Sequence, residues 1–217
     1  DIIPTHQDYL VDGMLSRGLN MFVGNSTGGK SMTALSLAIH VAAGRSFLGR
    51  DTLEGPVVYV NNDHPKNLQD RMVKKLCKGL GIDPNELPLY FINSDFHNLC
   101  SPLEADRLLK ICTDKKAVLV TLDNFTSCTG IKKKIESHIA QQYFIHLKQF
   151  RDGHDLASLT VHHFTKYDDI FRGPADIREN LECEYTIERL ESRNRVDFLE
   201  NGDTEIVKGV KTILVDN

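Results

Sequence analysis

The stretch GNSTGGKS, residues 24–31, carries glycines, a lysine and a serine at the spacing G-x-x-x-x-G-K-S. Glycines allow successive backbone N–H groups to point at phosphate oxygens, and the lysine that follows can reach the terminal phosphates of a nucleotide. The serine hydroxyl is a ligand for Mg²⁺. Because the apolar run LNMFV precedes the motif and a helix-like stretch follows it, we expect a phosphate-binding loop rather than a coincidental turn. The residues predicted to bind nucleotide are Gly24, Asn25, Ser26, Thr27, Gly28, Gly29, Lys30, Ser31 and Met32.

Two aspartates and a histidine end other apolar runs. Asp123 closes AVLVTLD, where a Walker B aspartate would help Ser31 to hold magnesium. Asp63 closes PVVYVNND, and a strand end beside the phosphate-binding loop would let it orient the attacking water; it could instead be a turn aspartate before a proline. His162 and His163 follow one another, so on a strand they point to opposite faces and do not share a metal. We expect one to lie in the core and the other to contact the γ-phosphate.

The elements that must position these residues alternate along the chain. Short apolar runs predict strands and amphipathic stretches predict helices, and this alternation is typical of an α/β fold with a mostly parallel sheet covered on both faces. Beyond residue 180 the pattern changes to β segments, which we expect to extend the sheet edge as antiparallel strands. The predicted strands are 19–23, 56–61, 89–93, 117–123 and 157–163; the predicted helices are 30–43, 65–80, 101–112 and 135–150; the late β segments are 182–190, 195–199, 204–207 and 211–215.

The bulk properties fit one domain of 217 residues, with a core at about 16–195 and a C-terminal β extension at about 182–217. A net charge of −4 gives no overall electrostatic footprint for nucleic acid. No apolar run is long enough to span a membrane, and the first residues do not resemble a secretory signal, so we expect a cytoplasmic protein. The five cysteines form no C-x-x-C pair, which favours reduced thiols over disulfides or zinc.

Four segments together resemble the RecA-like ATPases of the plasmid RepA replicative helicases, and are similar to the wider DnaB-type helicase and recombinase group. They are YLVDGMLSRGLNMFVGNSTGGKS, AAGRSFLGRDTLEGPVVYVNNDHP, VLVTLDNFTSCTG and LTVHHFTK. The resemblance implies a RecA fold, ATP with Mg²⁺, single-stranded DNA as partner, and a ring (such as a hexamer) or filament with nucleotide sites between subunits. It assigns Lys30 and Asp123 to catalysis and makes His163 the residue that couples ATP to DNA. Asp63 departs from the usual glutamate, and Asp63-His64-Pro65 from E-D-P.

The resemblance also implies an arginine from a neighbouring subunit. Glu191-Ser192-Arg193 stands in place of a K-x-R segment, which makes Arg193 the candidate, with Arg172, Arg178 and Arg195 as alternatives and structural ion pairing an equal reading for each. Two loops are expected to face a DNA channel, although charge runs also fit a solvated surface. Their basic residues are Lys132, Lys133 and Lys134 in the first loop, and Lys166 and Arg172 in the second.

The sequence therefore predicts an ATP-hydrolysing motor, with DNA helicase or translocase work in the replication of a plasmid, virus or similar element as the role that the resemblance implies. One alternative is an ATP-gated single-strand DNA-binding or recombination protein that hydrolyses slowly. Another is a GTPase, because Thr165-Lys166-Tyr167-Asp168 fits a guanine-reading T-K-x-D pattern; against it, DNFT after the Walker B strand lacks a D-x-x-G.

Overall fold

A computed structural model of the chain describes most of its residues. The described ranges are 9–25, 28–93, 98–130, 136–163, 175–190, 195–198, 204–207 and 211–216.

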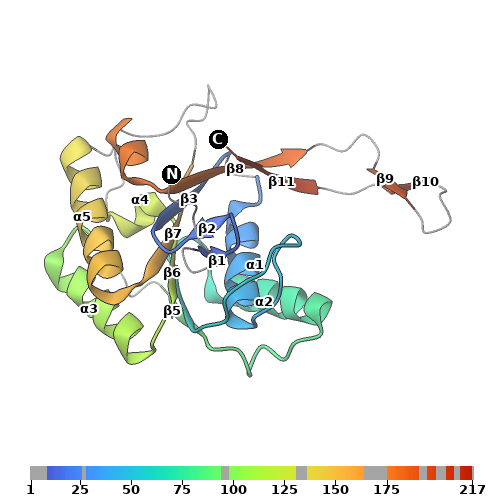
Figure 1. The fold of residues 1–217 in the computed structure, drawn as a ribbon, viewed down its shortest axis with the longest axis horizontal. Coiled ribbons are helices and arrows are strands. Elements are labelled where there is room, and N and C mark those ends of the chain that lie inside the picture. The colour runs from blue at the N-terminus through green and yellow to red at the C-terminus, as the bar shows by residue number, and fades with distance from the viewer. Residues whose placement is uncertain are drawn as a thin grey trace, which may run out of the picture.

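A seven-stranded sheet forms the centre of the fold, in the order β11-β8-β3-β7-β6-β4-β5. The six strands from β8 to β5 are parallel, and only β11 runs antiparallel, against β8 (Figure 1). This is the α/β, RecA-like arrangement that the sequence predicts. The strands are β3 (Leu19–Val23), β4 (Val57–Asn61), β5 (Leu89–Asn93), β6 (Leu119–Asp123), β7 (Ala157–Val161), β8 (Cys183–Leu190) and β11 (Lys211–Asp216).

Helices cover both faces of this sheet (Figure 1). The first layer holds α1 (Lys30–Ala42) and α2 (Lys66–Leu80), and the second holds α3 (Pro102–Asp114), the short α4 (Phe125–Cys128) and α5 (Ser137–His154). Successive strand residues face opposite layers, so Phe22 packs in the cluster with α1 while Met21 and Val23 pack with α3 and α5. One face of α1, with apolar residues at the spacing i, i+3, i+4 and i+7, is buried: Leu35, Ala38, Ile39 and Ala42.

Local chemistry explains where several helices begin and end. Ser101 is the N-cap of α3 with Pro102 as its first residue, and the serine side chain makes no capping hydrogen bond. Gly81 ends α2 in the left-handed region at φ 66°. Helix α5 runs to residue 154, four residues beyond the predicted end, and stops at Asp155, which also has positive φ.

The late β segments correct one prediction. β8 is parallel to β3 rather than an antiparallel edge strand. Parallel neighbours need a crossover connection, and the segment between β7 and β8, which includes the 3-10 helix Ala175–Asn180, supplies it. Only β11 is the antiparallel extension that we expected.

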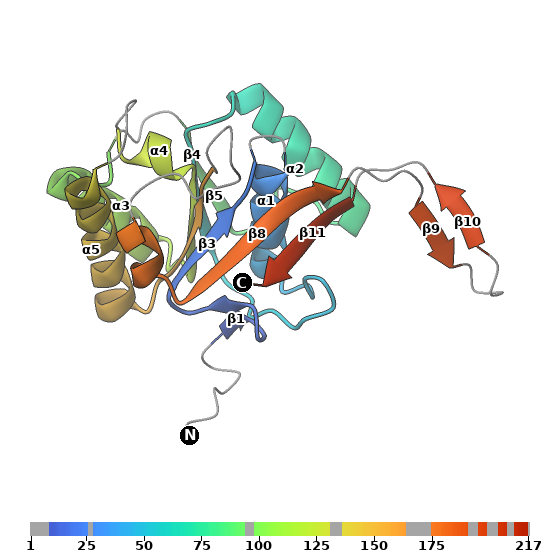
Figure 2. The same ribbon diagram turned by 90° about the horizontal axis from the view of Figure 1, so that it is seen from above.

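Two small sheets lie outside the main one. β9 (Arg195–Phe198) and β10 (Thr204–Val207) pair with each other in a hairpin that lies beyond the ends of β8 and β11 (Figures 1 and 2). The pair β1 (Tyr9–Val11) and β2 (Leu15–Ser16) was not predicted.

All five cysteines are free thiols, three of them buried, as expected from their spacing. None of the described helices combines the length and apolar character that a membrane crossing requires.

Candidate nucleotide-binding site

The strand order collects the candidate residues at one edge of the sheet. β3, β7, β6 and β4 are successive neighbours and run parallel, so their carboxyl ends meet at the same edge. The phosphate-binding loop follows β3, His163 follows β7, Asp123 ends β6 and Asp63 follows β4. Strand β4 is not a neighbour of β3 in the sheet, because β7 and β6 lie between them.

The backbone of the phosphate-binding loop requires glycine at two of the predicted positions. Gly24 has φ 146°, and a Cβ there would lie 2.3 Å from the carbonyl oxygen of Ile187 on β8. Gly29 has φ 90° and is the N-cap of α1. Side chains rarely tolerate either conformation. The loop therefore takes its shape from glycine and from the close approach of β8, so β8 forms part of this site.

Lys30 begins α1 and is buried, with 2% of its surface exposed. Its Nζ donates to the backbone oxygen of Asn25 in the loop at 2.6 Å. Burial lowers the pKa of Lys30 to about 8, while the charges of Asp123 and Asp63 act in the opposite direction. An ammonium group in this position gains from an anionic ligand, so the residue fits a nucleotide phosphate.

Asp123 is held by two hydroxyl groups in a buried position. The Ser31 hydroxyl donates to Oδ1 at 3.2 Å and the Tyr59 hydroxyl donates to Oδ2 at 2.8 Å. Burial raises the pKa of Asp123, and the hydrogen bonds from Tyr59 and Ser31 oppose that rise. A hydroxyl and a carboxylate side by side are oxygen ligands of the kind that Mg²⁺ prefers. Ser31 and Asp123 would therefore hold magnesium, which when bound would supply positive charge against the phosphates.

A pocket of about 210 Å³ opens beside these groups. Asp63 and His163 line the same pocket as Lys30 and Ser31, so the structure brings these four predicted site residues together. His64 and Met72 also line it and were not predicted as site residues; His64 follows Asp63 directly, and only the fold brings Met72 of α2 to the pocket. The full lining is Gly29, Lys30, Ser31, Met32, Asp63, His64, Met72 and His163.

The two neighbouring histidines lie in different surroundings, one in the core and one at the pocket. His162 is fully buried and packs edge-to-face on Phe125, with ring centroids 4.9 Å apart. His163 lines the pocket, and its Nε2 lies 3.2 Å from Nδ2 of Asn124, the residue after Asp123. His163 therefore links the pocket to the segment that follows Asp123.

Comparison with known protein families agrees with this geometry. The chain matches the family AAA_25, described as an AAA domain, over residues 2–169. The chain belongs to this AAA-domain family. The match covers more than three quarters of the 217 residues and supports a P-loop ATPase of the AAA and RecA-like kind, which binds nucleotide. None of the curated proteins matches the chain.

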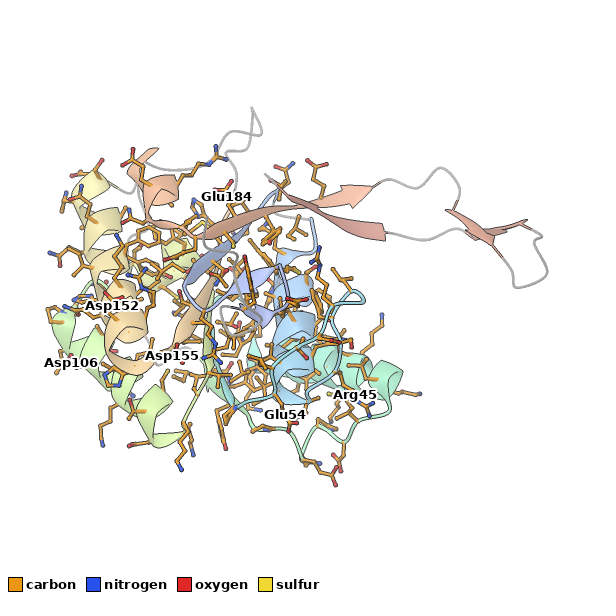
Figure 3. The ribbon with its side chains drawn as sticks, in the orientation of Figure 1. Arg45, Glu54, Asp106, Asp152, Asp155 and Glu184 are labelled. Atoms are coloured by element: carbon orange, nitrogen blue, oxygen red, sulfur yellow. The ribbon has the colours of Figure 1, made fainter. Side chains whose placement is uncertain are left out.

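Several predicted residues of this AAA domain lie outside the described residues: Ser26, Thr27, Lys132, Lys133, Lys134, Lys166, Arg172 and Arg193, together with the T-K-x-D segment 165–168. Arg178, one of the alternative trans arginines, is described. Its guanidinium makes two contacts with Glu184 on β8 (Figure 3), Nε to Oε2 at 3.0 Å and Nη2 to Oε1 at 2.9 Å. That pairing within the chain favours the structural reading of Arg178.

Proposed function

We propose that this AAA domain hydrolyses Mg·ATP and uses the reaction to move on single-stranded DNA as a helicase or translocase in the replication of a plasmid, virus or similar element. The observation that carries the ATPase step is the shared pocket of Lys30, Ser31 and Asp63, with Asp123 hydrogen-bonded to Ser31. That pocket joins a cation, a magnesium-binding pair and a water-orienting carboxylate around the space for a terminal phosphate.

Each residue has one role in this proposal. The loop amides and Lys30 neutralise the charge of the phosphates, and Ser31 with Asp123 binds magnesium. Asp63 orients the attacking water, because it is exposed at the pocket rather than buried beneath it. His163 contacts the terminal phosphate, and the loss of that phosphate changes its contact with Asn124, which follows Asp123.

DNA is proposed as the partner on the sequence and on the topology. In the sequence, the two basic segments come after the neighbouring parallel strands β6 and β7, the first of them after the short helix α4, and the carboxyl ends of both strands lie at the edge that holds the nucleotide site. Lysines in such loops would neutralise phosphates of the nucleic-acid backbone, and a ring would combine the positive charge of several subunits. A ring would also let an arginine, Arg193 as first candidate, enter the site of the next subunit.

The test is phosphate release from Mg·ATP with and without single-stranded DNA, followed by strand displacement on a forked duplex. We expect DNA to raise turnover and the duplex to be unwound, with Lys30→Ala inactive in both assays. Turnover without unwinding supports the slowly hydrolysing DNA-binding alternative, to which the shorter Asp63 side chain would contribute. Preference for GTP over ATP in a competition assay would reject the proposal in favour of the GTPase.

A further inference from the structure

The turn that carries Asp63 is fixed by a buried amide. Asn61, the last residue of β4, is only 3% exposed. Its Oδ1 accepts a hydrogen bond from the backbone N–H of His64 at 3.0 Å, and its Nδ2 donates to the backbone oxygen of the same residue at 2.8 Å. Because the backbone donor and acceptor have fixed roles, these two bonds determine which way the amide faces. One side chain therefore closes the turn over residues 61–64.

Two further side chains support this amide from behind. The Nδ2 atom of Asn61 also lies 2.5 Å from Oε1 of Gln69 and 3.0 Å from Oδ1 of Asn93. Gln69 is buried in the first turn of α2, and Asn93 ends the neighbouring strand β5. The Nδ2 group has two hydrogens: one goes to the backbone oxygen of His64 and the other to Gln69, the nearer acceptor, with Asn93 as a longer contact. A buried amide bonded in this way is rigid, and here it joins β4, α2 and the turn.

Asp63 depends on this turn for its position. Across the described ranges of the chain, no side chain hydrogen-bonds its carboxylate, which is exposed at the pocket. Its place relative to Lys30 is therefore set by the backbone on either side. Asn61 precedes Asp63 by two residues, and its side chain holds the backbone of His64, the residue after Asp63.

We propose that Asn61, supported by Gln69, is a positioning residue of the nucleotide site: it holds the turn so that Asp63 faces the terminal phosphate. This inference rests on the proposed ATPase function. Asn61 affects the rate through the position of Asp63 and leaves nucleotide affinity unchanged. Lys30 and Ser31, which would hold the phosphates and metal, belong to α1 on another part of the sheet edge.

The test is a double-mutant cycle on single-turnover phosphate release by the full chain. Asn61→Ala should slow release by about 10- to 100-fold, the loss expected when a reacting group shifts by about 1 Å, with Mg·ATP affinity changed less than about threefold. In an Asp63→Asn chain, the further change Asn61→Ala should have no added effect on the rate, because the group it positions is already disabled.

Asn93→Ala is the matched control. It removes another member of the same amide cluster but leaves both bonds from Asn61 to His64 in place, so release should stay within about twofold of the unaltered chain. If Asn61→Ala does not fold, as judged by circular dichroism and thermal melting, Gln69→Ala carries the test instead. Gln69→Ala also leaves the two bonds to His64 in place, but it removes the nearer and more deeply buried of the two other acceptors of Nδ2, at 2.5 Å against 3.0 Å for Asn93. We therefore expect a loss smaller than that of Asn61→Ala, about threefold to tenfold, that also vanishes in Asp63→Asn.

The outcomes separate the two proposals. An unaltered chain that binds Mg·ATP and releases no phosphate rejects the proposed function. Turnover in the unaltered chain together with unchanged turnover in Asn61→Ala rejects only the role of Asn61. Equal losses from Asn61→Ala in the Asp63 and Asp63→Asn backgrounds also reject it, because the amide would then act on the whole site and not through this carboxylate.

Discussion

Removal of the Tyr59 hydroxyl tests how the Asp123 carboxylate is held in its buried position. Tyr59→Phe deletes the donor that lies 2.8 Å from Oδ2 of Asp123 and leaves that oxygen buried, since Asp123 is only 1% exposed. A hydrogen bond to a charged group stabilises a protein by about 1.5–3 kcal/mol. The ring itself stays in the core, so this lost bond is the whole expected change. We therefore expect the free energy of unfolding to fall by about 2 kcal/mol, within that range.

Tyr143→Phe provides the comparison. Tyr143 is equally buried, but its hydroxyl pairs with the neutral Oγ1 of Thr160 at 2.9 Å in the other layer. A neutral pair contributes about 1 kcal/mol, so urea unfolding followed by circular dichroism should show roughly half the loss. Only Tyr59→Phe should also weaken the Mg²⁺-dependent part of ATP affinity in calorimetry. Equal destabilisation by the two changes, or no loss from Tyr59→Phe, would refute the argument that a buried ionised carboxylate is held there.

Further predictions concern the phosphate-binding loop. Because the pKa of Lys30 is lowered to about 8, the ammonium loses its proton as the pH rises above 8, so ATP affinity should fall there; Lys30→Arg, which stays charged, should show no such fall in a fluorescence titration, and an identical fall would count against the assignment. Gly24→Ala places a Cβ 2.3 Å from the Ile187 oxygen at positive φ, and should lower the melting temperature and abolish nucleotide binding. Gly79→Ala meets nothing within 4 Å inside α2 and should instead stabilise the chain by about 1 kcal/mol in denaturant unfolding; a similar melting temperature for the two glycine variants would contradict this reasoning.

Short motifs were enough to predict the phosphate-binding loop and Asp123. Their chemistry depends on residues that are close in sequence and on the buried strand just before them, and the structure has these strands and α1 at the predicted positions. Element boundaries within a few residues followed from apolar periodicity, glycine and proline.

The order of strands was not predictable in the same way, because neighbours in a sheet are chosen by long-range packing. Asp63 lines a pocket with Lys30 and Ser31, as expected, but the sequence did not show that two strands, β7 and β6, lie between β3 and β4. The contact of Ile187 with Gly24 and the bond from Tyr59 to Asp123 join residues far apart in the chain. Asn61 is local to its turn, yet nothing in the sequence distinguishes a closing amide from a neighbouring Asn62.

The central claim is that the pocket consumes ATP with Asp63 as the water-orienting group. The most direct measurement is phosphate release from Mg·ATP by the full chain beside its Asp63→Asn and Lys30→Ala variants, with nucleotide binding measured for each. We expect many turnovers from the unaltered chain, loss of about 100-fold or more in Asp63→Asn with binding retained, and loss of binding itself in Lys30→Ala. Release by Asp63→Asn at the rate of the unaltered chain would contradict the account.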